Sequence, residues 1–111
     1  MKVGFCTINY SELPLQEVVE LVAKKGYEAV EIPAYTDNGQ MDVDEMLKGD
    51  NAKKLKKQIN DAGLLVSGIS NHADSPLVLG PHGRDLASIC PGTPEEQIKF
   101  GTESMLKCAR L

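Results

Sequence analysis

The chain alternates short apolar runs with longer segments in which apolar residues recur every three or four positions. The short runs are rich in β-branched residues and bounded by turn formers, which predicts β-strands over residues 2–8, 27–34 and 64–70. In the second run Val30 and Ile32 alternate with Glu31, so Glu31 should lie on the opposite face of the sheet. The third run is apolar almost throughout, which predicts a buried strand.

The first segment with helical spacing lies between the first two strands. Val18, Val19 and Val22 fall on one face, Pro14 suits the first turn, and Gly26 supplies a stop signal. These residues predict a helix that begins at Pro14 and ends before Gly26.

A second helix is predicted over residues 50–62. Asp50 is a plausible N-cap, and Leu55 and Ile59 begin a narrow apolar stripe that Ala62 completes. The other face carries the only basic run of the chain, for which a solvated helix face is the default and contact with DNA the alternative. The run consists of Lys53, Lys54, Lys56 and Lys57.

A third helix is predicted from Thr93 onward. Thr93 can cap it, Pro94 occupies the first helical position, and Glu96 completes a capping box. The helical pattern continues to Leu111. The expected inner face consists of Ile98, Thr102, Met105 and Ala109.

The resulting order, β-α-β-α-β-α, predicts an α/β fold with a parallel sheet and right-handed crossovers. Three strands and three helices cannot easily cover both faces of such a sheet. Two arrangements remain: a small doubly wound domain, or the N-terminal part of a (β/α)8 barrel, which needs about 250 residues. Because the helical pattern persists at Leu111, we expect the second, with residues 1–111 forming one partial, truncated domain.

Composition narrows the possible partners. A formal net charge of -4 over 111 residues argues against a dedicated binder of nucleic acids or anionic membranes. No apolar run approaches the ~18 residues of a membrane span. Three widely spaced cysteines indicate neither a disulfide framework nor a zinc ribbon, so we expect a cytoplasmic protein.

The sequence resembles the xylose-isomerase-like (β/α)8 barrels, a superfamily of sugar-phosphate isomerases and epimerases that includes endonuclease IV-type DNA repair enzymes. The resemblance covers the whole chain. It is carried by KVGFCT in the first strand, PLQEVVELVAKKGYEAVEI through the first helix and second strand, LLVSGISNH at the third strand, LVLGPHGRD in the following loop, and PGTPEEQIKFGTESMLKCARL in the last helix.

The resemblance implies isomerisation or epimerisation of a sugar or sugar phosphate by proton abstraction beside a carbonyl. A divalent metal, Mn, Mg, Co or Zn, would polarise the substrate oxygens. Most of the acids and metal ligands of the family lie on later strands. The chain is therefore expected to supply one wall of an active site, incapable of turnover without the rest of the barrel.

Four residues are candidate substrate contacts at the expected mouth of the barrel. Glu31 should point inward near the end of its strand, unless it is a structural carboxylate satisfied by its neighbours. The resemblance makes His72 a substrate contact in the isomerase branch and a metal ligand in the DNA repair branch. His82 could reach back over the pocket or be an exposed loop histidine. Asn9 occupies a mouth position just beyond the first strand.

Two other residues near these candidates have more ordinary interpretations. Asn71 is a weaker pocket candidate because asparagine is also a routine turn former. Cys6 is expected to be buried packing, with no adjacent base to make it a nucleophile.

Two rival functions remain open. One is an endonuclease IV-like phosphodiesterase that uses zinc, which the acidic composition disfavours. The other is a non-catalytic module that buries its open sheet edges by forming a homo-oligomer.

Overall fold

The chain folds around an open sheet of three parallel strands. The computed structural model describes all 111 residues. Strands β1 (Gly4–Cys6), β2 (Ala29–Pro33) and β3 (Leu65–Ser70) lie in the order β1-β2-β3. The predicted α/β fold and parallel sheet are thus confirmed, while the sheet remains open rather than closed into a barrel.

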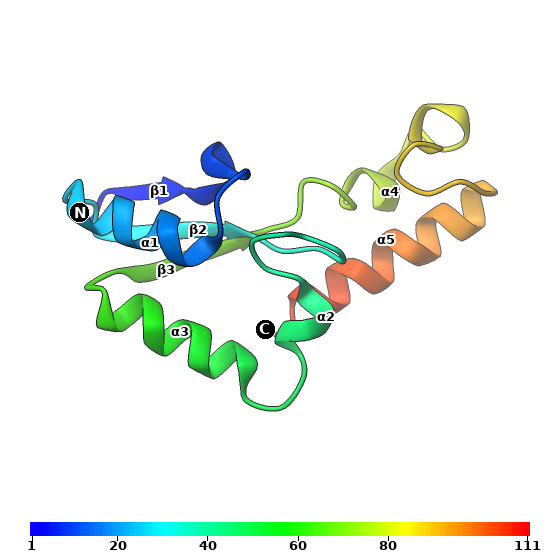
Figure 1. Cartoon of the computed structure of the whole chain (residues 1–111). Helices are drawn as coiled ribbons and strands as arrows, with labels where there is room; N and C mark the ends of the chain where they lie inside the picture. Colours follow the sequence, from blue (N-terminus) through cyan, green and yellow to red (C-terminus); the bar gives the residue numbers. More distant parts are fainter.

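Helices connect the strands and follow the last one (Figure 1). The main helices are α1 (Leu15–Lys24), α3 (Asn51–Asp61) and α5 (Pro94–Cys108). Two single-turn helices, α2 (Val43–Met46) and α4 (Pro76–Leu79), interrupt the long loops. Two 3-10 turns complete the chain, Thr7–Tyr10 and Arg84–Leu86.

One hydrophobic core lies between the sheet and the two crossover helices. Val18 and Val22 of α1 and Ile59 of α3 are buried together with Val30 and Ile32 of β2. Since Val30 and Ile32 share one face of their strand, both helices cover that same face. The helices are therefore not divided between the two faces, as a doubly wound domain would require.

The first strand is shorter than predicted because the chain turns immediately after Cys6. Residues 7–10 form a 3-10 turn, not the end of a strand. The Asn9 side chain donates to the Cys6 carbonyl at 3.0 Å, and the Tyr10 ring stacks on Phe5. These contacts favour the turn over extended backbone.

The prediction that the third strand is buried is wrong. Leu65 and Ile69 retain 46% and 39% of their accessible surface. β3 is an edge strand that pairs only with β2. No strand covers its other side, so its side chains are less buried than those of a central strand.

Helix α3 begins as predicted, but Asp50 makes no capping hydrogen bond through its side chain. Its carboxylate instead lies 3.8 Å from the Lys53 ammonium group. The predicted apolar stripe holds, because Ile59 is buried and Leu55 and Ala62 pack against the core.

Helix α5 turns a different face inward from the one predicted. Gln97, Gly101 and Ser104 are buried, whereas Ile98 and Met105 are partly exposed. The helix packs so closely on α4 that a Cβ atom at Gly101 would lie 2.6 Å from the Cβ of Leu77. Close approach thus selects the small residues, and the helix ends at Cys108, not at Leu111. The predicted capping box of Thr93 and Glu96 is confirmed.

None of these helices has the length and apolar character needed to span a lipid bilayer.

Candidate functional site

Polar side chains from all three strands meet at the carboxyl ends of the sheet. Cys6 ends β1, Glu31 is the central residue of β2 and pairs with Cys6, and His72 follows β3 by two residues. Parallel strands present their carboxyl ends at one edge, where open α/β sheets and barrels bind ligands. We refer to Cys6, Glu31 and His72 as the carboxyl-end cluster.

Glu31 is the centre of this cluster. Its Oε1 atom accepts a hydrogen bond from Cys6 Sγ at 3.5 Å and lies 3.9 Å from His72 Nε2. The register of the sheet causes the first contact, because Cys6 and Glu31 are direct partners across β1 and β2. The cluster therefore has one carboxylate shared between a thiol and an imidazole.

The cluster lies on the face of the sheet opposite to the hydrophobic core. Glu31 alternates with the buried Val30 and Ile32, so it points away from α1 and α3, as predicted. The side chains of His72 and Glu31 keep 67% and 42% of their surface exposed. Both groups are accordingly open to a ligand from solvent.

Cys6 is more than the inert packing residue predicted from the sequence. The prediction that it has no adjacent base is wrong, because the Glu31 carboxylate is its hydrogen-bond partner. Desolvation by burial, and then the negative charge of Glu31, raise the pKa of the Cys6 thiol. The thiol is therefore protonated at neutral pH and acts as a hydrogen-bond donor, not as a nucleophile.

Ser70 is a further polar residue at this edge that the sequence did not single out. It is the last residue of β3 and pairs with Pro33 of β2. Its Oγ atom is enclosed and has no hydrogen-bond partner. An enclosed hydroxyl without a partner is energetically unfavourable, so Ser70 lowers the stability of this end of β3.

The structure does not bring His82 to the cluster. Its Nε2 atom lies 2.8 Å from the Leu77 carbonyl oxygen, within the segment that joins α4 and α5. That segment lies beside the first half of α5, away from the sheet (Figure 1). Asn9 is exposed near the end of β1, and its side-chain amide is bound to the Cys6 carbonyl.

Asn71 precedes His72 in the chain, but its side chain does not join the carboxyl-end cluster and has a structural role. Its side chain donates to Ser104 Oγ of α5 and accepts from the backbone N–H of Asp74, both at 2.9 Å. Ser104 in turn donates to the Asp74 carboxylate. These three buried residues, Asn71, Asp74 and Ser104, form what we call the docking network, which fixes α5 to the end of β3.

The cluster by itself does not provide a metal site. No group of three or more His, Cys, Asp or Glu side chains in the chain is arranged to hold a metal ion. Within the cluster, Glu31 and His72 supply one oxygen and one nitrogen donor. Zinc takes three or four protein ligands, so Glu31 and His72 could supply only part of the metal site that the sequence predicts for a complete barrel. No protein-family model matches the chain, and no similar protein was found among curated sequences.

Proposed function

We propose that this chain forms the substrate-binding wall of a sugar or sugar-phosphate isomerase or epimerase with a (β/α)8 barrel. The observation that carries the proposal is the position of Glu31, whose carboxylate faces both Cys6 and His72 at the carboxyl ends of adjacent parallel strands. In a barrel, this edge is the mouth where active sites form. The helices cover only the other face of the sheet, as barrel helices do.

The chemistry of the pair suits a polyhydroxylated substrate. The Glu31 carboxylate accepts hydrogen bonds from neighbouring hydroxyl groups, and the exposed His72 imidazole can donate to a carbonyl oxygen. The protonated Cys6 thiol holds the carboxylate in place from the other side. Under this proposal, Glu31 and His72 orient the substrate, and the proton-transferring acids lie outside these 111 residues.

The proposal assigns the metal to the complete barrel. His72 and Glu31 are too few to bind it here, so the remaining ligands would come from strands beyond the three described. When bound, such a metal stabilises the negative charge that develops on the substrate oxygens. A cytoplasmic location suits the three free cysteines.

The test is to titrate the isotopically labelled chain with a ketose phosphate and follow its backbone amide signals by NMR. We expect weak binding, with a Kd of about 1 mM, because only a few charge-assisted hydrogen bonds form on an open surface. The shifts should cluster at residues 6, 31 and 70–72. Glycerol phosphate, which lacks the carbonyl group, is the matched ligand control.

Glu31→Gln is the informative variant, because it keeps the size of the side chain and removes the charge. It should abolish the shifts at these positions, whereas Glu28→Gln, at an exposed carboxylate directly before β2, should leave them unchanged. Shifts that persist in Glu31→Gln, or that appear only elsewhere, would contradict the proposal.

A second candidate function is a non-catalytic module that self-associates through its open sheet. The partial exposure of Leu65 and Ile69 and the unpaired outer edges of β1 and β3 favour it. Size-exclusion chromatography with light scattering separates the two: a stable dimer that does not bind the ketose phosphate supports the module, and a monomer argues against it.

A further inference from the structure

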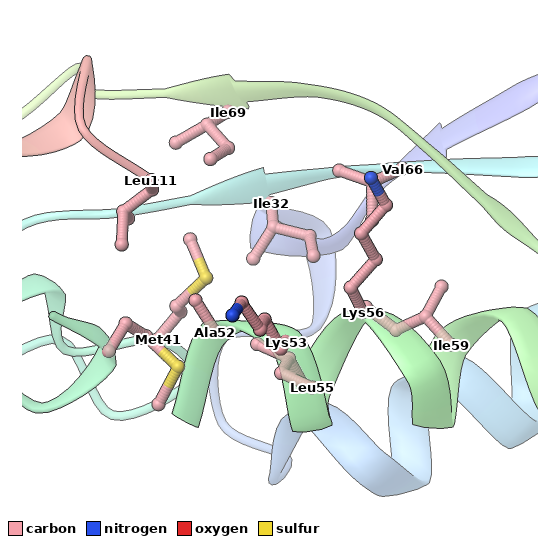
Figure 2. A pocket seen from close by; sticks show the side chains of 11 residues that line it. Ile32, Met41, Ala52, Lys53, Leu55, Lys56, Ile59, Val66, Ile69 and Leu111 are labelled. Atoms are coloured by element: carbon pink, nitrogen blue, oxygen red, sulfur yellow. The ribbon is translucent and has the colours of Figure 1, made fainter. Parts of the chain in front are cut away.

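An apolar groove lies on the helix-covered side of the sheet, opposite to the carboxyl-end cluster. It runs between α3 and the strands β2 and β3, with a volume of about 340 Å³ (Figure 2). Ile32, Val66 and Ile69 form its sheet side, and Leu55 and Ile59 lie on its helix side. Its volume lies at the lower end of the range for small-molecule sites, roughly 300–1,000 Å³.

The composition of the groove is apolar with two positive charges. Nine of the 11 lining residues are hydrophobic, and the other two are Lys53 and Lys56. The Lys56 side chain rises from α3 toward the sheet beside Val66 (Figure 2), whereas the Lys53 side chain is 88% exposed to solvent. Lys56 takes part in no ion pair, and Lys53 has only the 3.8 Å contact with Asp50.

One end of the groove is adaptable in shape. Met41 and Met46 line it, and both are unbranched side chains that fit irregular apolar ligands. Ile69, which is 39% exposed, shows that the groove opens to solvent at the edge strand. A ligand can therefore enter without unfolding the core.

We propose that this groove binds an anionic amphiphile of the fatty-acid type, with its hydrocarbon chain against β2 and β3 and its carboxylate between Lys53 and Lys56. The proposal depends on the apolar floor together with Lys56, which has no ion-pair partner, and Lys53, whose only ion-pair contact is the 3.8 Å one with Asp50. A neutral apolar ligand would gain nothing from the lysines, and a sugar phosphate would leave the apolar floor without an apolar partner. The site goes beyond the proposed function, because Glu31 and His72 lie on the other face.

The test uses decanoate below its micelle concentration, with binding to the whole chain measured by calorimetry. We expect saturable binding to one site, and amide shifts in NMR spectra centred on Val66 and Ile69. Decyltrimethylammonium has the same hydrocarbon chain and the opposite charge, so it should bind far more weakly. Equal binding of the two amphiphiles would overturn the assignment of the lysines.

The chain itself offers a matched pair of variants. Lys53→Gln/Lys56→Gln should weaken decanoate binding about fivefold, since each exposed ion pair contributes roughly 0.5 kcal/mol. Lys54→Gln/Lys57→Gln removes the same charge from the same helix away from the groove and should leave the affinity unchanged. An equal loss in both double variants, or no saturable binding to the natural chain, would refute the proposal. All four lysines are exposed, so folding is not at risk.

Discussion

Asn71 and His72 are adjacent in sequence, yet they belong to two polar regions of opposite character. Asn71 is 8% exposed and has both ends of its amide bonded within the docking network. His72 is 67% exposed and has a single 3.9 Å contact with Glu31. Buried, fully bonded polar groups stabilise one structure, whereas exposed groups with free bonding capacity are available to ligands. The end of β3 thus combines an attachment point for α5 with a wall of the candidate site.

The largest effect on stability is expected at Gln97, which is fully buried on α5. Its amide donates to the carbonyls of Gly83 and Cys90 and accepts from the Gly83 N–H. Gln97→Ala leaves these backbone groups without partners and opens a cavity, so we expect a loss of about 3 kcal/mol in the free energy of unfolding. Urea denaturation measures it. The exposed Gln16→Ala serves as control; equal losses in both variants would contradict the structural role of Gln97.

The second prediction compares the two neighbours directly. Asn71→Ala should destabilise the chain by about 2 kcal/mol, because Ser104 and Asp74 lose a buried partner. His72→Ala should change stability by less than about 0.5 kcal/mol, as is usual for exposed side chains. Both values come from the same denaturation experiment. If His72→Ala lowers the free energy of unfolding as much as Asn71→Ala does, then His72 also has a structural role and the distinction between the two residues is wrong.

Asn71 and Glu31 also show which features of the structure can be predicted from the sequence and which cannot. Periodicity predicted the strands, the main helices and the face of the sheet on which Glu31 lies, because these depend on the order of neighbouring residues. It did not predict that Asn71 bonds to Ser104, more than thirty positions away, nor which face of α5 packs inward. The chosen face carries Gly101 and polar residues, which become favourable only when α4 approaches closely.

The contact between Cys6 and Glu31 could not be predicted from the sequence for a similar reason. It depends on the register between β1 and β2, which no short-range pattern specifies. The groove between α3 and the sheet could not be predicted either. A run of four lysines on a helix indicates a solvated face, and only the positions of β2 and β3 beside α3 reveal the groove.

A smaller effect is expected from pH at the contact between α5 and α2. Hydrogen bonds from Lys107 and Thr36 lower the pKa of Asp44 below its ordinary value of 3.8. A lowered folded-state pKa stabilises the chain above pH 3.8, and this stabilisation is lost as the pH falls through the folded-state value. Both side chains of the pair are more than one-third exposed, so solvent screening limits the contribution to less than about 1 kcal/mol.

The measurement is urea unfolding of the natural chain and of Asp44→Asn at about pH 6 and about pH 2. The natural chain should lose more stability on acidification than Asp44→Asn, by the amount that Asp44 contributes. Identical acid dependence in the two proteins would show that this ion pair does not hold α5.

The smallest expected effect concerns the Cys6 thiol. Since the charge of Glu31 raises the pKa of Cys6, Glu31→Gln should lower that pKa and increase the thiolate fraction. Alkylation of Cys6 by iodoacetamide at about pH 8 should become about twofold faster. Cys90 in the same molecule is the internal control. An unchanged or slower rate at Cys6 would mean that the carboxylate does not act on the thiol.

The central claim is that a sugar phosphate binds at the carboxyl-end cluster, and the two histidines of the chain test it most directly. The imidazole signals of His72 and His82 can be followed together by NMR while a ketose phosphate is added. We predict a saturable shift of the His72 signals and none at His82, whose ring is bound to the Leu77 carbonyl beside α5. Equal shifts of both histidines, or a shift of His82 alone, would contradict the claim.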